Sequence, residues 1–131
     1  MIKPHWILEE VVLAIHKILL SDHGGLSGLR DRALLDSSLN RPKQLYTYQN
    51  QATIYDLAAS YCYGLAKNHP FVDGNKRIAL TTAVVFLEHN QIDFAASEAE
   101  TVIIIESLAA GNISEQNLSL WFEKQSQKDT T

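Results

Sequence analysis

Ten consecutive residues, from Ile78 to Leu87, are all apolar or small, and none of them is charged. A helix through this run, over about Asn75–Asn90, has no polar face, and a helix that is apolar on every side is buried on every side. The chain has no stretch of about 18 apolar residues, which is the length that a membrane-spanning helix needs. The sequence therefore predicts a bundle of helices packed around a buried central helix.

The rest of the chain also has helical periodicity and little strand character. Thr53 with Asp56, and Ser97 with Glu100, have the spacing of capping boxes that start helices, and Ser114 is placed to cap another. Apolar residues recur at helical spacing after each of these starts. The prediction is an all-α fold, a compact six-helix bundle. Its other helices are expected over His5–Leu20, over Arg30–Leu39 and from Thr53, Ser97 and Ser114 onward.

Pro42 is expected to end the second helix, because the residue before a proline is biased out of the helical region. The segment Lys43–Gln51 that follows is then the one candidate in the chain for a β-hairpin or flap. The length and the lack of a linker indicate a single domain over residues 1–131, with a polar tail over about 125–131.

Composition narrows the function classes. Cys62 is the only cysteine, so the chain has no internal disulfide and no cysteine-based zinc site. The other histidines have no zinc-binding spacing. The N-terminus shows no signal peptide, which predicts a cytoplasmic protein without membrane attachment. A formal net charge of −4 argues against direct binding to nucleic acid.

The polar segment His69–Arg77 lies between two strongly apolar helices, directly at the start of the buried one. The first turn of a helix has unpaired backbone N–H groups and the positive end of the helix dipole, which together attract anions. Gly74 lets the backbone approach a ligand closely, and Lys76 and Arg77 add two positive charges. This combination predicts a phosphate-binding site.

Two further side chains give this segment catalytic potential. Asp73 offers the hard oxygen ligand that magnesium prefers, and His69 can accept a proton near neutral pH. Taken alone, each residue has a plain structural explanation, because Asp73 or Asn75 could simply cap the helix and His69 could be a hydrogen-bonded residue at a helix end. Their combination at one helix start favours a functional site.

The nine residues His69–Arg77 resemble the signature His-Pro-Phe-x-Asp/Glu-Gly-Asn-Gly-Arg of the Fic/Doc superfamily. Lys76 stands where the nucleotidyl-transferring Fic branch has glycine, and Leu80 stands where that branch has a second arginine. Both departures resemble the Doc (death-on-curing) branch. The upstream region within Gly24–Pro42 is also similar to Doc proteins, and the resemblance covers roughly Leu8–Phe122.

The resemblance implies a six-helix bundle and a toxin of a type II toxin–antitoxin pair. Doc-like toxins use ATP and Mg²⁺ to phosphorylate a threonine on elongation factor Tu, a translation factor. His69 is then expected to be the base, Asp73 the metal ligand, and Gly74, Asn75, Lys76 and Arg77 the phosphate-binding residues. An antitoxin partner is also implied, a Phd-like protein that folds on binding.

Three other functions remain open from the sequence. The first is nucleotidyl transfer to a protein hydroxyl at the same site, against which Lys76 and Leu80 argue. The second is a helical ribonuclease toxin, although no arginine is followed by histidine at the Arg-x(4–6)-His spacing. The third is a binding module without catalytic activity, against which the complete polar segment argues.

Overall fold

The computed structural model describes residues 3–126 and shows six α-helices, which confirms the predicted all-α bundle. Over these residues β-structure is limited to one isolated bridge, between Leu29 and Phe71. None of the described helices is both long enough and apolar enough to cross a membrane. The helices are α1 (Glu9–His23), α2 (Arg32–Tyr48), α3 (Ile54–Asn68), α4 (Asn75–His89), α5 (Glu98–Ala110) and α6 (Glu115–Ser126).

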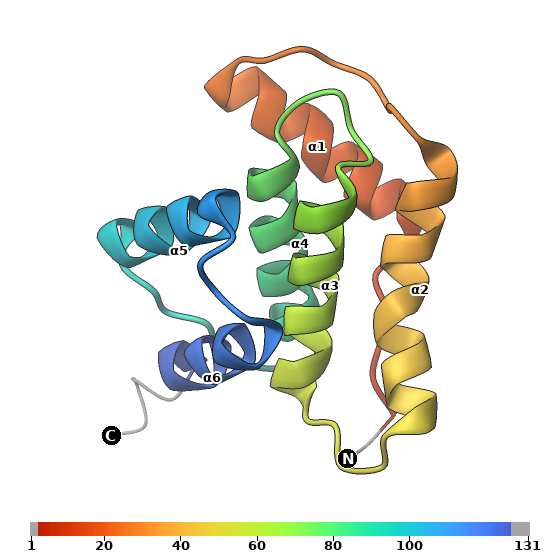
Figure 1. Ribbon diagram of the computed structural model, residues 1–131, viewed down its shortest axis with the longest axis vertical. Helices are drawn as coiled ribbons and strands as arrows, with labels where there is room; N and C mark the ends of the chain where they lie inside the picture. Colours follow the sequence, from red (N-terminus) through yellow and green to blue (C-terminus); the bar gives the residue numbers. More distant parts are fainter. Residues whose placement is uncertain (1–2, 127–131) are drawn as a thin grey trace.

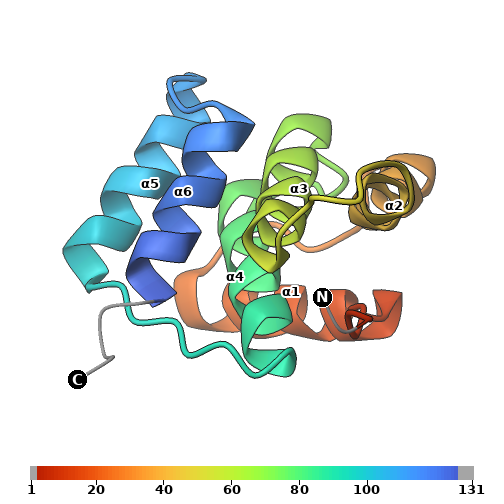
Figure 2. The same cartoon turned by 90° about the horizontal axis from the view of Figure 1, so that it is seen from below.

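Helices α3 and α4 lie side by side in opposite directions at the centre of the molecule (Figure 1). Helix α2 packs against α3, and α1 packs against α4. Helices α5 and α6 lie together on the other side of this central pair, as the view from below shows (Figure 2). The short connection between α3 and α4 is therefore flanked by helices from both ends of the chain.

The burial of α4 confirms the prediction from its apolar sequence. Phe86 is fully buried in this helix, where its ring contacts Tyr61 of α3, with 5.0 Å between centroids, and stacks on Trp6 at 5.9 Å. Helix α3 is equally central, however, which the sequence prediction did not include. Its buried residues are Leu57, Ala58, Ala59, Ser60, Tyr61, Cys62, Gly64, Leu65 and Ala66.

The predicted helix starts are confirmed by their hydrogen bonds. The Thr53 side chain accepts from the backbone N–H of Asp56, whose carboxylate accepts in return from the Thr53 N–H. Ser97 and Glu100 form the same reciprocal pair at the start of α5. The Ser114 hydroxyl accepts from the backbone N–H of Asn117 at the start of α6. These local sequence signals determined where the helices begin.

The prediction for the second helix was wrong. Helix α2 continues through Pro42 to Tyr48, so Lys43–Gln51 forms no hairpin or flap. A proline inside a helix removes one hydrogen bond and costs about 3 kcal/mol. Here the residues around it pack against α3: Pro42 is buried, and the Arg41 guanidinium donates to the Ser60 side chain and to the Glu115 carboxylate. Tertiary contacts thus keep the helix intact past the proline.

The ends of the chain also differ from the prediction. Helix α1 spans Glu9–His23 rather than His5–Leu20, because the preceding backbone has partners elsewhere: the Ile7 N–H donates to the Tyr61 hydroxyl. At the other end, Gln125 was expected in a polar tail, but it is 2% exposed and its amide donates to Glu100. The remainder of the predicted tail, residues 127–131, lies outside the described residues.

We predict that Phe86→Ala destabilises the protein by about 3–5 kcal/mol, because it removes a large buried ring and leaves a cavity between α3, α4 and Trp6. Urea unfolding followed by circular dichroism measures this change. Leu120→Ala, at a side chain that is 56% exposed, is the matched control and should change stability by less than about 0.5 kcal/mol. Equal losses of stability in the two variants would contradict the proposed contribution of Phe86 to core packing.

Candidate active site

The connection between α3 and α4 turns sharply through two residues with left-handed backbone. His69 ends α3 with φ 48°, and Gly74 precedes the first turn of α4 with φ 76°. A non-glycine residue in this region is uncommon and is often found at functional sites. The His69 side chain is exposed, and it lines a cavity together with residues 74–77 at the start of α4.

Asn75 holds this connection from inside. Its side-chain amide donates to the Phe71 carbonyl and accepts from the Phe71 N–H, both at 3.0 Å, and the residue is buried. Neither Asn75 nor Asp73 caps α4, whose N-cap is Gly74 without a side-chain hydrogen bond. Both capping alternatives were therefore wrong. Because the Asn75 side chain is paired with the Phe71 backbone, its backbone N–H is left as the candidate phosphate contact.

His16 of α1 supports the same connection from the other side. It is buried, its ring stacks on Phe71 with 3.8 Å between centroids, and its Nε2 lies 2.8 Å from the Asp73 carbonyl oxygen. A carbonyl only accepts, so Nε2 carries the proton and donates. In the sequence, His16 is one of the histidines without zinc-binding spacing, and no role was predicted for it. Nothing in the local pattern of α1 indicates that this ring meets a segment 57 residues away.

The Asp73 carboxylate is exposed and held in place by two backbone amides. The N–H groups of Leu26 and Gly74 donate to its two oxygens, and these hydrogen bonds lower the pKa of Asp73 below its usual value. Gly25 lies so close that a Cβ there would be 2.8 Å from an Asp73 carboxylate oxygen, and its φ is +122°. Glycine is therefore required at position 25 for Asp73 to keep this position.

The α1–α2 connection is hydrogen-bonded to the α3–α4 connection. The Val72 N–H donates to the Gly28 carbonyl, and the Arg30 N–H donates to the Pro70 carbonyl. The Arg30 side chain donates to the carbonyls of Asn68 and His69, at 2.9 and 2.6 Å. Residues 24–30 had resembled the Doc region in sequence, and the structure shows that they lie directly against the candidate site.

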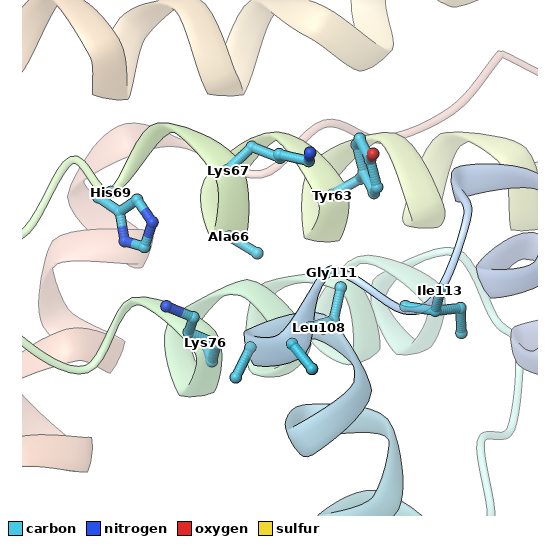
Figure 3. A pocket seen from close by; sticks show the side chains of 10 residues that line it. Tyr63, Ala66, Lys67, His69, Lys76, Leu108, Gly111 and Ile113 are labelled. Atoms are coloured by element: carbon cyan, nitrogen blue, oxygen red, sulfur yellow. The ribbon is translucent and has the colours of Figure 1, made fainter.

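The surroundings of His69 disfavour the charged form of its ring. Although the ring is exposed, its partial desolvation is the largest cause that lowers the pKa of His69, and the positive charges of Lys76 and Arg30 lower it further. In Figure 3, His69 at the end of α3 and Lys76 in the first turn of α4 lie at the same end of a small cavity between the two helices. A neutral imidazole can take a proton from a hydroxyl group.

A larger cavity of about 820 Å³ opens over the start of α4 and is closed on its far side by α5. All the predicted site residues line it: His69, Asp73, Gly74, Asn75, Lys76 and Arg77. Lys76 and Arg77 diverge from there: Lys76 also lines the small cavity beside α3, whereas Arg77 also lines one beside α1. The two cations can therefore contact different parts of a phosphate chain.

The donors present fit magnesium bound together with a nucleotide. The described residues contain no cluster of three or more His, Cys, Asp or Glu side chains that could hold a metal ion alone. Asp73 offers one exposed carboxylate at the rim of the large cavity, and its lowered pKa keeps it ionised. Magnesium commonly uses one or two carboxylates and completes its coordination with substrate phosphates and water.

The geometry defines a class of protein: a helical domain in which one turn brings an exposed histidine next to a helix start that carries Lys76 and Arg77. The sequence model of the Fic/DOC family matches residues 6–87. "Protein kinase doc" of Escherichia phage P1 is 31% identical over 108 residues, which cover 82% of this chain and 85% of that protein. "Toxin Doc" of Mycolicibacterium smegmatis is 40% identical over 74 residues, covering 56% of this chain and 57% of that protein.

The chain belongs to the Fic/DOC family. Both curated relatives are Doc proteins, so the resemblance to the Doc branch, first seen in Lys76 and Leu80, is confirmed. The names of these relatives support a toxin of the Fic/Doc type and a protein-modifying enzyme.

We predict that His16→Phe destabilises the protein by about 1–2 kcal/mol, because the ring still stacks on Phe71 but the Asp73 carbonyl loses its donor. The measurement is urea unfolding, together with NMR of the backbone amides of residues 71–74. His16→Gln, which keeps an N–H donor, should lose less stability. His89→Phe, at an exposed histidine, is the control. A His16→Phe variant with wild-type stability and unchanged signals from these amides would disprove the positioning role.

Proposed function

We propose that this protein is a cytoplasmic toxin that transfers the terminal phosphate of ATP to a serine or threonine hydroxyl of a translation factor. The observation that carries the proposal is the placement of His69 beside the positive end of α4, where Lys76 and Arg77 line one cavity of nucleotide size. Phosphoryl transfer depends mainly on positioning and charge stabilisation, and this site offers both. The name "Protein kinase doc" of one relative supports the same chemistry.

Each residue of the site has a separate proposed role that follows from its position. His69 takes the proton of the attacking hydroxyl, which its lowered pKa suits because the imidazole is neutral at physiological pH. The backbone N–H groups at the start of α4 hold phosphate oxygens, as Gly74 leaves them open to a ligand. Lys76 and Arg77 contact the phosphate chain from different sides and stabilise the charge that spreads over it in the transition state.

Asp73 is the residue proposed to hold magnesium. When bound, the metal ion neutralises charge on the phosphate oxygens. The carboxylate is kept in place for this role by the Leu26 and Gly74 amides, while His16 holds the carbonyl of the same residue. Asp73 is therefore positioned through its backbone and its side chain at once, which preorganises the site before a nucleotide binds.

Phosphoryl transfer is favoured over nucleotidyl transfer by two residues. Lys76 fills space and adds charge at the phosphate-binding turn where the Fic branch has glycine. Leu80 is buried one helical turn further on and lines the large cavity with an apolar side chain instead of the second arginine. Without that arginine, the outer phosphates lose a contact that the nucleotidyl-transferring orientation uses, which favours the terminal phosphate at His69.

The proposed target and partner follow from the Doc resemblance. The target is elongation factor Tu, whose phosphorylation blocks translation. The partner is a Phd-like antitoxin that folds on binding and covers the site. Residues 43–51 take no part in such a contact at the site, because they lie at the opposite end of α3, where the α2–α3 connection is found (Figure 1). A helix of 15 residues separates the two ends by about 22 Å.

We predict that label from ATP marked on the terminal phosphate reaches purified elongation factor Tu, and that label on the α-phosphate does not. His69→Ala should reduce the rate by about 10²–10⁴-fold, because it removes the base. His89→Ala, at the far end of α4, is the control and should keep wild-type activity. Transfer of α-label with release of pyrophosphate would instead establish nucleotidyl transfer. Wild-type activity of the His69→Ala variant would refute the base assignment.

We also predict that the acid limb of kcat/KM lies below about pH 6.5, the ordinary pKa of histidine. Because the pKa of His69 is lowered, the ring stays neutral to a more acidic pH than an ordinary histidine. Activity is therefore lost only when the pH falls through the lowered pKa of His69. Lys76→Met removes one of the charges that lower the pKa and should move the acid limb to higher pH. Lys124→Met is the control. An acid limb at the same pH in the Lys76→Met variant would contradict an effect of the Lys76 charge on the pKa of His69.

A further inference from the structure

The small cavity beside His69 has no role in nucleotide binding as proposed above. It has a volume of about 240 Å³ and lies between the last turns of α3, the first turn of α4 and the α5–α6 connection. Figure 3 shows Tyr63, Ala66 and Lys67 on α3 facing Leu108, Gly111 and Ile113, with His69 and Lys76 at one end. Ligand cavities for nucleotide-sized molecules are about 300–1,000 Å³, so this one suits a side chain rather than a nucleotide.

His69 and Lys76 are the two residues that line both this cavity and the large one over α4. In phosphoryl transfer the attacking and leaving oxygens lie roughly in line, on opposite sides of the transferred group. A terminal phosphate at the His69 end of the large cavity therefore leaves the side away from the nucleotide for the attacking hydroxyl. The small cavity meets the large one at His69 and Lys76, at this end.

The lining of the small cavity has a defined chemistry. Ala66, Leu108 and Ile113 form an apolar surface, and the ionisable side chains that can carry positive charge there are Lys67, His69 and Lys76. Among the described residues, no carboxylate lines it, although the chain as a whole has a net charge of −4. The Lys67 ammonium lies 5.2 Å from the centre of the Tyr63 ring, which holds this charge at the edge of the cavity.

We infer that the small cavity binds the acceptor segment of the protein substrate, and that it selects an apolar side chain next to the acceptor hydroxyl and an acidic side chain close by. This inference rests on the proposed phosphoryl transfer. The apolar side chain packs on Ala66, Leu108 and Ile113, and the acidic side chain pairs with Lys67. The hydroxyl then lies at the His69 end, where its proton is taken.

The test uses two peptides that each carry one threonine followed by valine, with either glutamate or lysine at the next position. With ATP labelled on the terminal phosphate, the glutamate peptide should be phosphorylated with about fivefold higher kcat/KM, the size of one partly exposed charge pair. Lys67→Glu should abolish or reverse this preference while leaving KM for ATP unchanged. Lys124→Glu, which makes the same charge change on α6, should keep the wild-type preference.

A second variant tests the cavity without removing any of its contacts. Ala110→Glu places a carboxylate at an exposed lining position on the last turn of α5 and should weaken the use of the glutamate peptide. Equal rates for the two peptides with the wild-type protein, or an unchanged preference in Lys67→Glu, would overturn the inference.

Peptide binding observed by NMR separates this inference from the proposed function. The glutamate peptide should shift the signals of Ala66 and Ile113 more strongly than the lysine peptide does, whether or not phosphate is transferred. Binding there, with no transfer to the peptides or to elongation factor Tu, would refute the kinase proposal and leave only a peptide-binding cavity. Transfer to the peptides without any shift of these signals would refute the cavity and leave the kinase standing.

Discussion

Two hydrogen bonds between the Asn75 side chain and the Phe71 backbone hold the turn on which the whole site depends. They are buried, so water does not compete for them, and breaking them would leave polar groups unpaired inside the core. Phe71 is in turn fixed under the His16 ring, and α3 and α4, the two helices joined by this turn, are the most extensively buried in the described structure. The rigidity of the site is therefore a consequence of core packing.

This support explains how a small domain keeps unfavourable backbone at its surface. His69 and Gly74 both have left-handed backbone, and the Asp73 carboxylate is held in the open by two amides. Each feature depends on another segment: Arg30 donates to the His69 carbonyl, Leu26 to the Asp73 carboxylate and His16 to the Asp73 carbonyl. Polar groups that would otherwise adapt to solvent are thus fixed before a ligand arrives, which is the condition for electrostatic catalysis.

Helix α5 is much less buried than α3 and α4. It closes the large cavity and contributes to the small one, yet Ile104 is its one buried residue in the described structure, and Val102 and Ile103 are exposed. Ile105 and Leu108 of α5 are only partly buried against the core, so this helix has less core packing than α3 or α4. The cavities on both sides of His69 are therefore bounded by a rigid wall of α3 and α4 and by a wall that core packing holds less firmly.

The sequence by itself determined the helices whose signals are local. The apolar run Ile78–Leu87 predicted the buried α4, capping residues such as Thr53 predicted helix starts, and the segment His69–Arg77 predicted the site and the family. Only the tertiary structure decided that α2 passes through Pro42, that Asn75 faces the core and that His16 supports Asp73. These outcomes depend on partners far away in the chain, and a pattern of neighbouring residues carries no information about which distant group will satisfy a hydrogen bond.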